Sequence, residues 1–129
     1  MKNTILLLAS LFAITLFISS CDKDDDPIDP NINTNKTTLL IKVVDEDGKA
    51  VQGANVRLFN DSQNWSDDKN PTRTNVPTSS GGFATFTELD PIEYYFIAEK
   101  GNLNNWFENS DTGGALTKDG TATVSTIIR

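Results

Sequence analysis

The chain has 129 residues, a formal net charge of −7, no histidine and a single cysteine. So acidic a chain is poorly suited to bind nucleic acid or anionic lipid headgroups. The lack of histidine removes the commonest general base and the commonest zinc ligand, and one cysteine excludes a disulfide framework.

Residues 1–20 predict a secretory signal peptide. Lys2 supplies the positive charge, and an apolar run from Ile5 to Ile18 follows, which is shorter than the roughly 20 apolar residues of a membrane-spanning helix. Residues 18–21, "ISSC", resemble a bacterial lipobox. That resemblance implies that Cys21 carries a diacylglyceryl group, so its partner is a membrane, and becomes the first mature residue. The alternative is an ordinary signal peptide with an incidental cysteine.

Residues 21–36 combine the lipidated cysteine with an acidic tether, which is predicted to be disordered because it holds two prolines and few apolar residues. The run Asp22, Lys23, Asp24, Asp25 and Asp26 resembles the export signal of Bacteroidetes-type surface lipoproteins. It implies an outer-membrane lipoprotein exposed at the cell surface. Two alternatives stay open: a plain tether facing the periplasm, or retention at the inner membrane under the enterobacterial sorting rule.

Residues 37–129 are enough for one small domain. Period-two alternation predicts strands at residues 38–44, 54–59, 83–89, 93–100 and 121–129. The side chains expected to face the core are Leu39, Ile41, Val43, Ala54, Val56, Leu58, Ala84, Phe86, Tyr94, Phe96 and Ala98. Residues 60–80 are expected to be a long polar insert, and no segment repeats apolar residues at helical spacing. The fold class is therefore all-β, an antiparallel β-sandwich.

The order of short motifs is similar to that of the carboxypeptidase regulatory-like domains. The matching positions are Asp47, Gly48, Val51, Gly53, Ala54 and Val56 in the first half, and Thr78, Gly82, Phe86, Leu89, Pro91 and Tyr94 in the second. The resemblance implies an Ig-like, prealbumin-like sandwich of about seven strands that is not itself an enzyme.

Surface adhesin domains with a similar "DEDGK" start carry an isopeptide bond between lysine and asparagine or aspartate. In those domains a buried glutamate catalyses the bond. Aligned on "DEDG", the reactive lysine falls at Val43, and aligned on the tyrosine of the second motif, the catalytic glutamate falls at Ala98. Lys42 and Glu99 are each one residue away, and a one-residue offset turns a strand side chain to the opposite face. We therefore expect no isopeptide bond.

No enzyme activity, cofactor or metal is expected. The single thiol is expected to be acylated, and paired carboxylates such as Glu88 and Asp90 lie beside turns rather than facing a cleft. Asp61, Asp67 and Asp68 supply oxygen ligands but no calcium-loop signature.

The candidate binding residues are Trp65, Trp106 and Phe107, which lie in two polar segments rich in Asn and Asp. If these residues form a binding surface, loops at these points are expected to meet at one end of the sandwich, where exposed aromatics would mark an interaction site. The alternative is that each tryptophan covers the open end of the core. The predicted function is a structural or protein-interaction accessory module of the cell envelope, such as a subunit of a surface uptake system. The competing hypothesis is a lectin-like module that binds carbohydrate or peptide.

Overall fold

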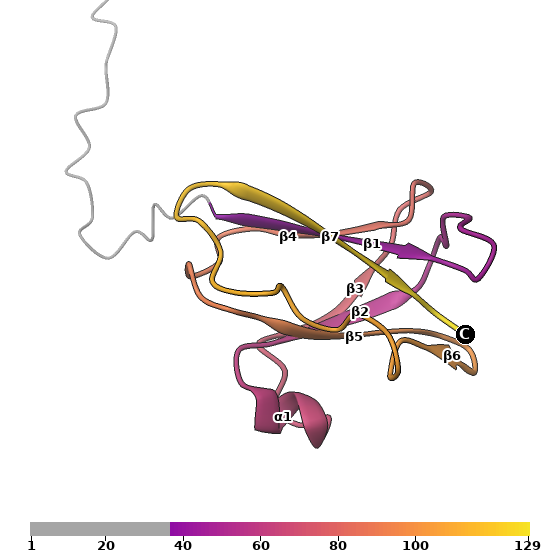
Figure 1. The fold of residues 1–129 in the computed structure, drawn as a ribbon, viewed down its shortest axis with the longest axis horizontal. Helices are drawn as coiled ribbons and strands as arrows, with labels where there is room; N and C mark the ends of the chain where they lie inside the picture. Colours follow the sequence, from indigo (N-terminus) through magenta and orange to yellow (C-terminus); the bar gives the residue numbers. More distant parts are fainter. Residues whose placement is uncertain (1–36) are drawn as a thin grey trace, which may run out of the picture. The chain divides into compact units, whose positions relative to one another are not determined.

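The computed structural model describes residues 37–129, where two β-sheets stack face to face and one short helix lies outside them (Figure 1). One sheet has the strand order β4-β1-β7, formed by β1 (Thr38–Val44), β4 (Phe83–Phe86) and β7 (Thr121–Ile127). The other has the order β3-β2-β5-β6, formed by β2 (Asn55–Phe59), β3 (Arg73–Pro77), β5 (Tyr95–Lys100) and β6 (Leu103–Asn104). The prediction of an all-β sandwich is confirmed.

One strand pair departs from the antiparallel arrangement. β1 pairs antiparallel with β4 but parallel with β7, with Thr38 opposite Thr121. Parallel neighbours need a long connection, and here residues 45–120 supply it, forming β4 and the whole of the other sheet on the way. The four-stranded sheet is antiparallel at each of its pairs.

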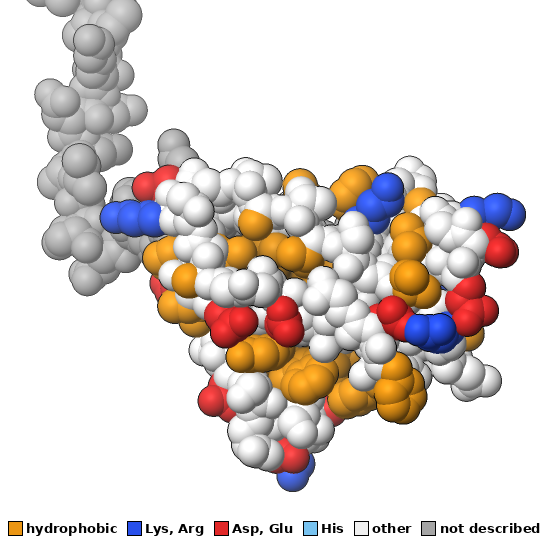
Figure 2. All heavy atoms as spheres, viewed as in Figure 1, with side chains coloured by type: hydrophobic (Ala, Val, Ile, Leu, Met, Phe, Trp, Pro, Cys, Tyr) orange, Lys and Arg blue, Asp and Glu red, His pale blue; other side chains and the backbone are white. Residues whose placement is uncertain are grey.

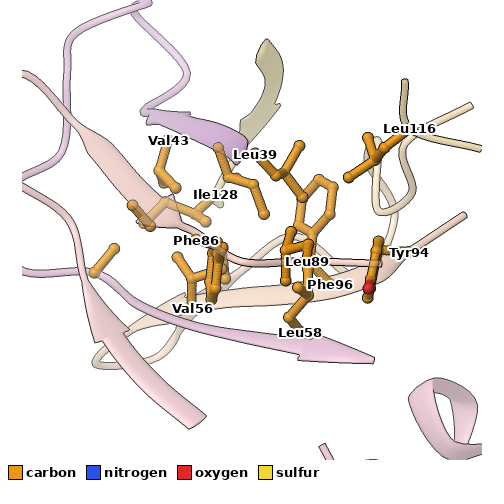
Figure 3. Packing of buried hydrophobic residues seen from close by; sticks show 14 residues of the cluster. Leu39, Val43, Val56, Leu58, Phe86, Leu89, Tyr94, Phe96, Leu116 and Ile128 are labelled. Carbon is orange, nitrogen blue, oxygen red and sulfur yellow. The ribbon is translucent and has the colours of Figure 1, made fainter. Parts of the chain in front are cut away.

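The hydrophobic core lies between the two sheets, as the alternation predicts. Each side chain expected to face inward is at most 2% exposed. Figure 3 shows Phe86, Phe96 and Tyr94 beside the aliphatic side chains of both sheets. The core also takes in Leu116 and Ile128, which lie outside the strands.

Two residues of the family-like pattern have clear structural roles. Thr78 is buried; its hydroxyl donates to the carbonyl oxygen of Val51 at 2.5 Å and accepts the N–H of Ala54 at 2.9 Å. Gly82 has a φ of 80°, and a Cβ there would lie 2.7 Å from the carbonyl oxygen of Val43. Only glycine combines this backbone conformation with so close an approach.

The polar insert at residues 60–80 is more ordered than the sequence predicts. It contains the helix α1 (Ser62–Ser66) and the edge strand β3. Both lack an apolar pattern: α1 has no buried residue, and Val76 is the one aliphatic residue of β3. The predicted strand at 83–89 ends early, at Phe86, and Glu88 in the following bend adopts a left-handed φ of 56°.

Within residues 37–129, no helix has the length and apolar character needed to cross a membrane.

Candidate binding surface

The helix α1, which carries Trp65, lies against the outer face of the four-stranded sheet (Figure 1). Asp61 caps it, since one carboxylate oxygen accepts the N–H groups of Gln63 and Asn64, each at 2.9 Å. The indole Nε1 of Trp65 donates to the carbonyl oxygen of Phe96 in β5 at 3.1 Å. The indole therefore has a defined position and orientation on the sheet.

Arg57 ties the end of this helical segment to the sheet. Its guanidinium lies 2.9 Å from the carboxylate of Asp68, just after α1, and 2.6 Å from that of Glu99 in β5. The hydrogen bond with Glu99 is the main cause that raises the pKa of Arg57 above its usual value, and Asp68 adds to it. The Arg57 side chain is only 15% exposed and its charge is already paired with two carboxylates, so it is not available to an external ligand.

A second segment approaches the same face from the C-terminal side. After β6 the chain follows β5, and the N–H of Phe96 donates to the carbonyl oxygen of Ser110 at 2.8 Å. Between β6 and Ser110, residues 106–109 leave the edge of β5. This excursion carries Trp106 and Phe107.

Where residues 106–109 leave β5, the side chain of Asn105 makes hydrogen bonds with β5 that a neighbouring strand would otherwise make. Its side chain is 1% exposed; Oδ1 accepts the N–H of Ala98 at 2.9 Å, and Nδ2 donates to the carbonyl oxygen of Asn109 at 3.2 Å. Sequence reasoning missed Asn105, since one asparagine among several in a polar segment carries no distinguishing signal.

Three aromatic rings from these segments form a row that we call the aromatic row: Tyr95, Trp65 and Trp106. The ring centroid of Trp65 lies 6.0 Å from that of Tyr95 and 6.0 Å from that of Trp106, with interplanar angles of 33° and 40°. Trp106 is 39% exposed, and the neighbouring Phe107 is 93% exposed. Sequence reasoning assigned Tyr94 and Phe96 to the core, which leaves Tyr95 on the opposite face of the strand, but it did not assign Tyr95 to the site.

The aromatic row lies over the outer face of the sheet, not at one end of the sandwich as expected. Tyr95 alternates with Tyr94 and Phe96, which face the core, and so its ring points outward. Phe59 and Ile97 share this outer face by strand register and are nevertheless buried, because the crossing segments cover them. Figure 2 shows hydrophobic side chains gathered between α1 and the end of β5.

The Tyr95 end of the aromatic row is acidic. The Tyr95 hydroxyl donates to the Glu93 carboxylate at 3.2 Å. Loss of hydration raises the pKa of Tyr95, and the negative charges of Glu93, Asp111 and Asp61 raise it further. The ion pairs found within residues 37–129 join Arg57 to Asp68 and Glu99, and Arg129 to Glu108. Glu93, Asp111 and Asp61 therefore have no cationic partner in that part of the chain.

The carboxylates considered for calcium serve separate purposes. Asp61 caps α1, Asp67 accepts a hydrogen bond from Gln63 at 3.0 Å, and Asp68 pairs with Arg57. In the described part of the chain, no three side chains of the metal-binding types converge.

The residues tested for an isopeptide bond lie on different sheets. Lys42 of β1 sits over the Phe83 ring, its Nζ 5.6 Å from the ring centroid, while Glu99 of β5 pairs with Arg57. Cys21 and the acidic run Asp22, Lys23, Asp24, Asp25 and Asp26 lie outside the residues that the structure describes.

A pocket lies beside β7, lined by Val44, Glu108, Asn109, Ser125, Thr126 and Ile127. Asn109 joins the 106–109 segment to β7. Its Nδ2 donates to the carbonyl oxygen of Ser125 at 3.2 Å, and its carbonyl oxygen accepts from the Thr126 hydroxyl at 2.6 Å. These two hydrogen bonds hold residues 106–109 against β7.

Comparison with known proteins supports the fold and goes no further. No family model and no curated protein matches the chain, so the carboxypeptidase regulatory-like resemblance stays a prediction. A streptococcal ancillary pilin aligns with a TM-score of 0.54 and 18% identity, over 74% of this chain and 32% of that one. The Bacillus anthracis TIE protein aligns with a TM-score of 0.50 and 20% identity, over 73% of this chain and 16% of that one. This chain thus spans a minor part of each.

Proposed function

We propose that this protein is a non-enzymatic module of the cell envelope, anchored by lipid at Cys21, that binds a protein partner through the aromatic row and Phe107. One observation carries the proposal: two segments distant in sequence are fixed by specific hydrogen bonds so that Trp106 and Phe107 remain exposed beside Trp65. A monomer gains nothing from exposed aromatics, and such surfaces usually mark interaction sites.

A structural or adhesive role fits the chemistry of the domain. Its side chains near the aromatic row offer no nucleophile paired with a base, and the chain has no histidine to act as one. The streptococcal protein of similar fold is named an ancillary pilin, and that name supports a structural role. Membership of a surface uptake system is a more specific version of the same proposal.

A protein partner is favoured over a glycan by the state of the nearby amides. Sugar sites need side-chain amides free to bond hydroxyl groups beside the aromatic ring. Here Asn105 and Asn109 are bonded to the backbone, and Asn104 Oδ1 accepts the N–H of Trp106 at 3.1 Å. The exposed Trp106 is consistent with the lectin-like alternative, but the bonded amides of Asn105 and Asn109 are not free to bind sugar hydroxyl groups beside it.

Site-directed photo-crosslinking in intact cells tests the proposal. A photoreactive phenylalanine analogue replaces Phe107 in the full-length protein, and the matched control replaces Phe83, a half-buried aromatic on the outer face of the other sheet. We expect one discrete adduct from position 107 that disappears with Trp106→Ala, and none from position 83. No adduct at 107, or the same adducts from both positions, would contradict the proposal.

A further inference from the structure

The surface around the aromatic row changes from acidic to apolar along its length. Glu93 and Asp111 flank Tyr95 at one end: Glu93 accepts from its hydroxyl at 3.2 Å, and Asp111 forms a β-bridge with it. At the other end, Trp106 is 39% exposed and Phe107 is 93% exposed. Figure 2 shows acidic side chains directly beside the hydrophobic ones on this part of the face. A partner must therefore satisfy both negative charge and apolar surface.

The cations on the same two strands do not neutralise this end. Arg57 of β2 is held between Asp68 and Glu99. Lys100 of β5 donates through Nζ to the carbonyl oxygen of Gln52 at 2.6 Å. Arg73 of β3 donates to the carbonyl oxygen of Thr72 at 3.2 Å. Within residues 37–129 no ion pair includes Glu93 or Asp111, so their charges are available to a partner.

Charge decides between the possible occupants. The chain's own segment at residues 22–26 holds four aspartates and one lysine, so it would bring like charge to Glu93 and Asp111. A second copy packed face to face would place the same carboxylates against one another, which is unfavourable. A basic segment is complementary to this surface, because lysine and arginine pack their apolar stems on aromatic rings and direct their charges to carboxylates.

We propose that the aromatic row binds a polypeptide segment of its partner that carries lysine or arginine next to apolar residues. Its cations contact Glu93 and Asp111, and its apolar side chains contact Trp106 and Phe107. This inference rests on the proposed function and names the chemistry of the partner.

Two synthetic peptides test the inference against the full-length protein in detergent. One alternates lysine with leucine and the other alternates glutamate with leucine, and binding is followed by fluorescence anisotropy. We expect the lysine peptide alone to bind, with an affinity that falls as salt rises. Glu93→Gln combined with Asp111→Asn should weaken it about tenfold, and Trp106→Ala with Phe107→Ala should abolish it.

The matched control combines Glu46→Gln with Asp47→Asn in the exposed turn after β1, which changes the net charge equally at a different place. The control should bind the lysine peptide as the unmodified protein does. Equal loss in both charge variants, or equal binding of the glutamate peptide, would overturn the inference. Binding of a soluble β-glucan with no binding of the lysine peptide would also overturn it, in favour of a glycan site.

Failure of this inference is distinguishable from failure of the proposed function. If the adduct at position 107 forms in cells and the Glu93→Gln, Asp111→Asn variant leaves it unchanged, the surface binds a partner without using cations. The proposed function then stands and the basic-segment inference falls.

Discussion

Asn105 illustrates how one buried polar side chain shapes a surface. It supplies the hydrogen bonds that a neighbouring strand would give to β5, accepting from Ala98 and donating to Asn109 and, at 3.4 Å, to the carbonyl oxygen of Phe96. Because these groups are buried, water cannot easily replace the amide. The excursion that exposes Trp106 and Phe107 therefore depends on Asn105.

We expect Asn105→Ala to destabilise the domain by about 1–3 kcal/mol, because it leaves the buried N–H of Ala98 without an acceptor. Urea unfolding of the variant measures this. Asn102→Ala, at an exposed position in the turn before β6, is the control and should change stability by less than about 0.5 kcal/mol. Equal stability of the two variants would show that the amide does not hold the excursion.

The two tyrosines should both titrate above the usual value of about 10. Burial raises the pKa of Tyr94, while loss of hydration and then Glu93 raise that of Tyr95. Since the folded pKa values exceed the unfolded ones, the folded state favours the neutral phenols. The stability that this preference contributes is fully present below about pH 10 and is lost as pH rises through the folded pKa values. Ultraviolet titration of phenolate measures them, and Glu93→Gln should lower the value for Tyr95 alone. A shift of Tyr94 as well would contradict this assignment.

At the scale of elements, α1 depends on its contacts with the sheet. A helix of five residues is far too short to be stable by itself in water. The Asp61 cap, the bond from Trp65 to Phe96 and the pair of Arg57 with Asp68 hold it in place. The helix, in turn, positions the central ring of the aromatic row.

The two faces of β4 provide a test of strand orientation. Phe86 is 2% exposed within the core, whereas Phe83 is half-buried on the outer face under Lys42. Phe86→Ala should cost about 3–5 kcal/mol, as should Tyr94→Ala in the facing sheet, because each leaves a cavity. Phe83→Ala should cost much less in the same thermal or urea unfolding measurement. Similar costs at Phe83 and Phe86 would mean that the strand register is wrong.

At the scale of the whole molecule, the proposed function needs the domain to be attached to a membrane. The lipobox-like residues 18–21 predict that Cys21 provides the attachment. Cys21→Ser should abolish labelling by a palmitate analogue and move the protein from the membrane fraction to the soluble fraction. Unchanged membrane attachment would reject Cys21 as the anchor.

Surface display is a separate prediction from lipidation. Replacing Asp22, Lys23, Asp24, Asp25 and Asp26 with alanine should make the domain resistant to protease added to intact cells, while labelling at Cys21 persists. If the unmodified and altered proteins are equally accessible, the acidic run acts only as a tether.

The sequence by itself determined the fold class and the buried face of each long strand. Alternation along a strand is a local property, so Leu39, Ile41 and Val43 in β1 could be assigned to the core without knowing their partners. Segments without alternation, α1, β3 and β6, could not be found in this way, because contacts from elsewhere in the chain stabilise them.

Only the tertiary structure decided that Trp65, Tyr95 and Trp106 meet. Their adjacency depends on the pairing of β2 with β5 and on the excursion that Asn105 permits, and neither interaction leaves a local pattern in the sequence. The sequence singled out the two tryptophans and Phe107 as surface aromatics. It could not place them over the outer face of the sheet, because that position is set by hydrogen bonds between residues far apart in the chain.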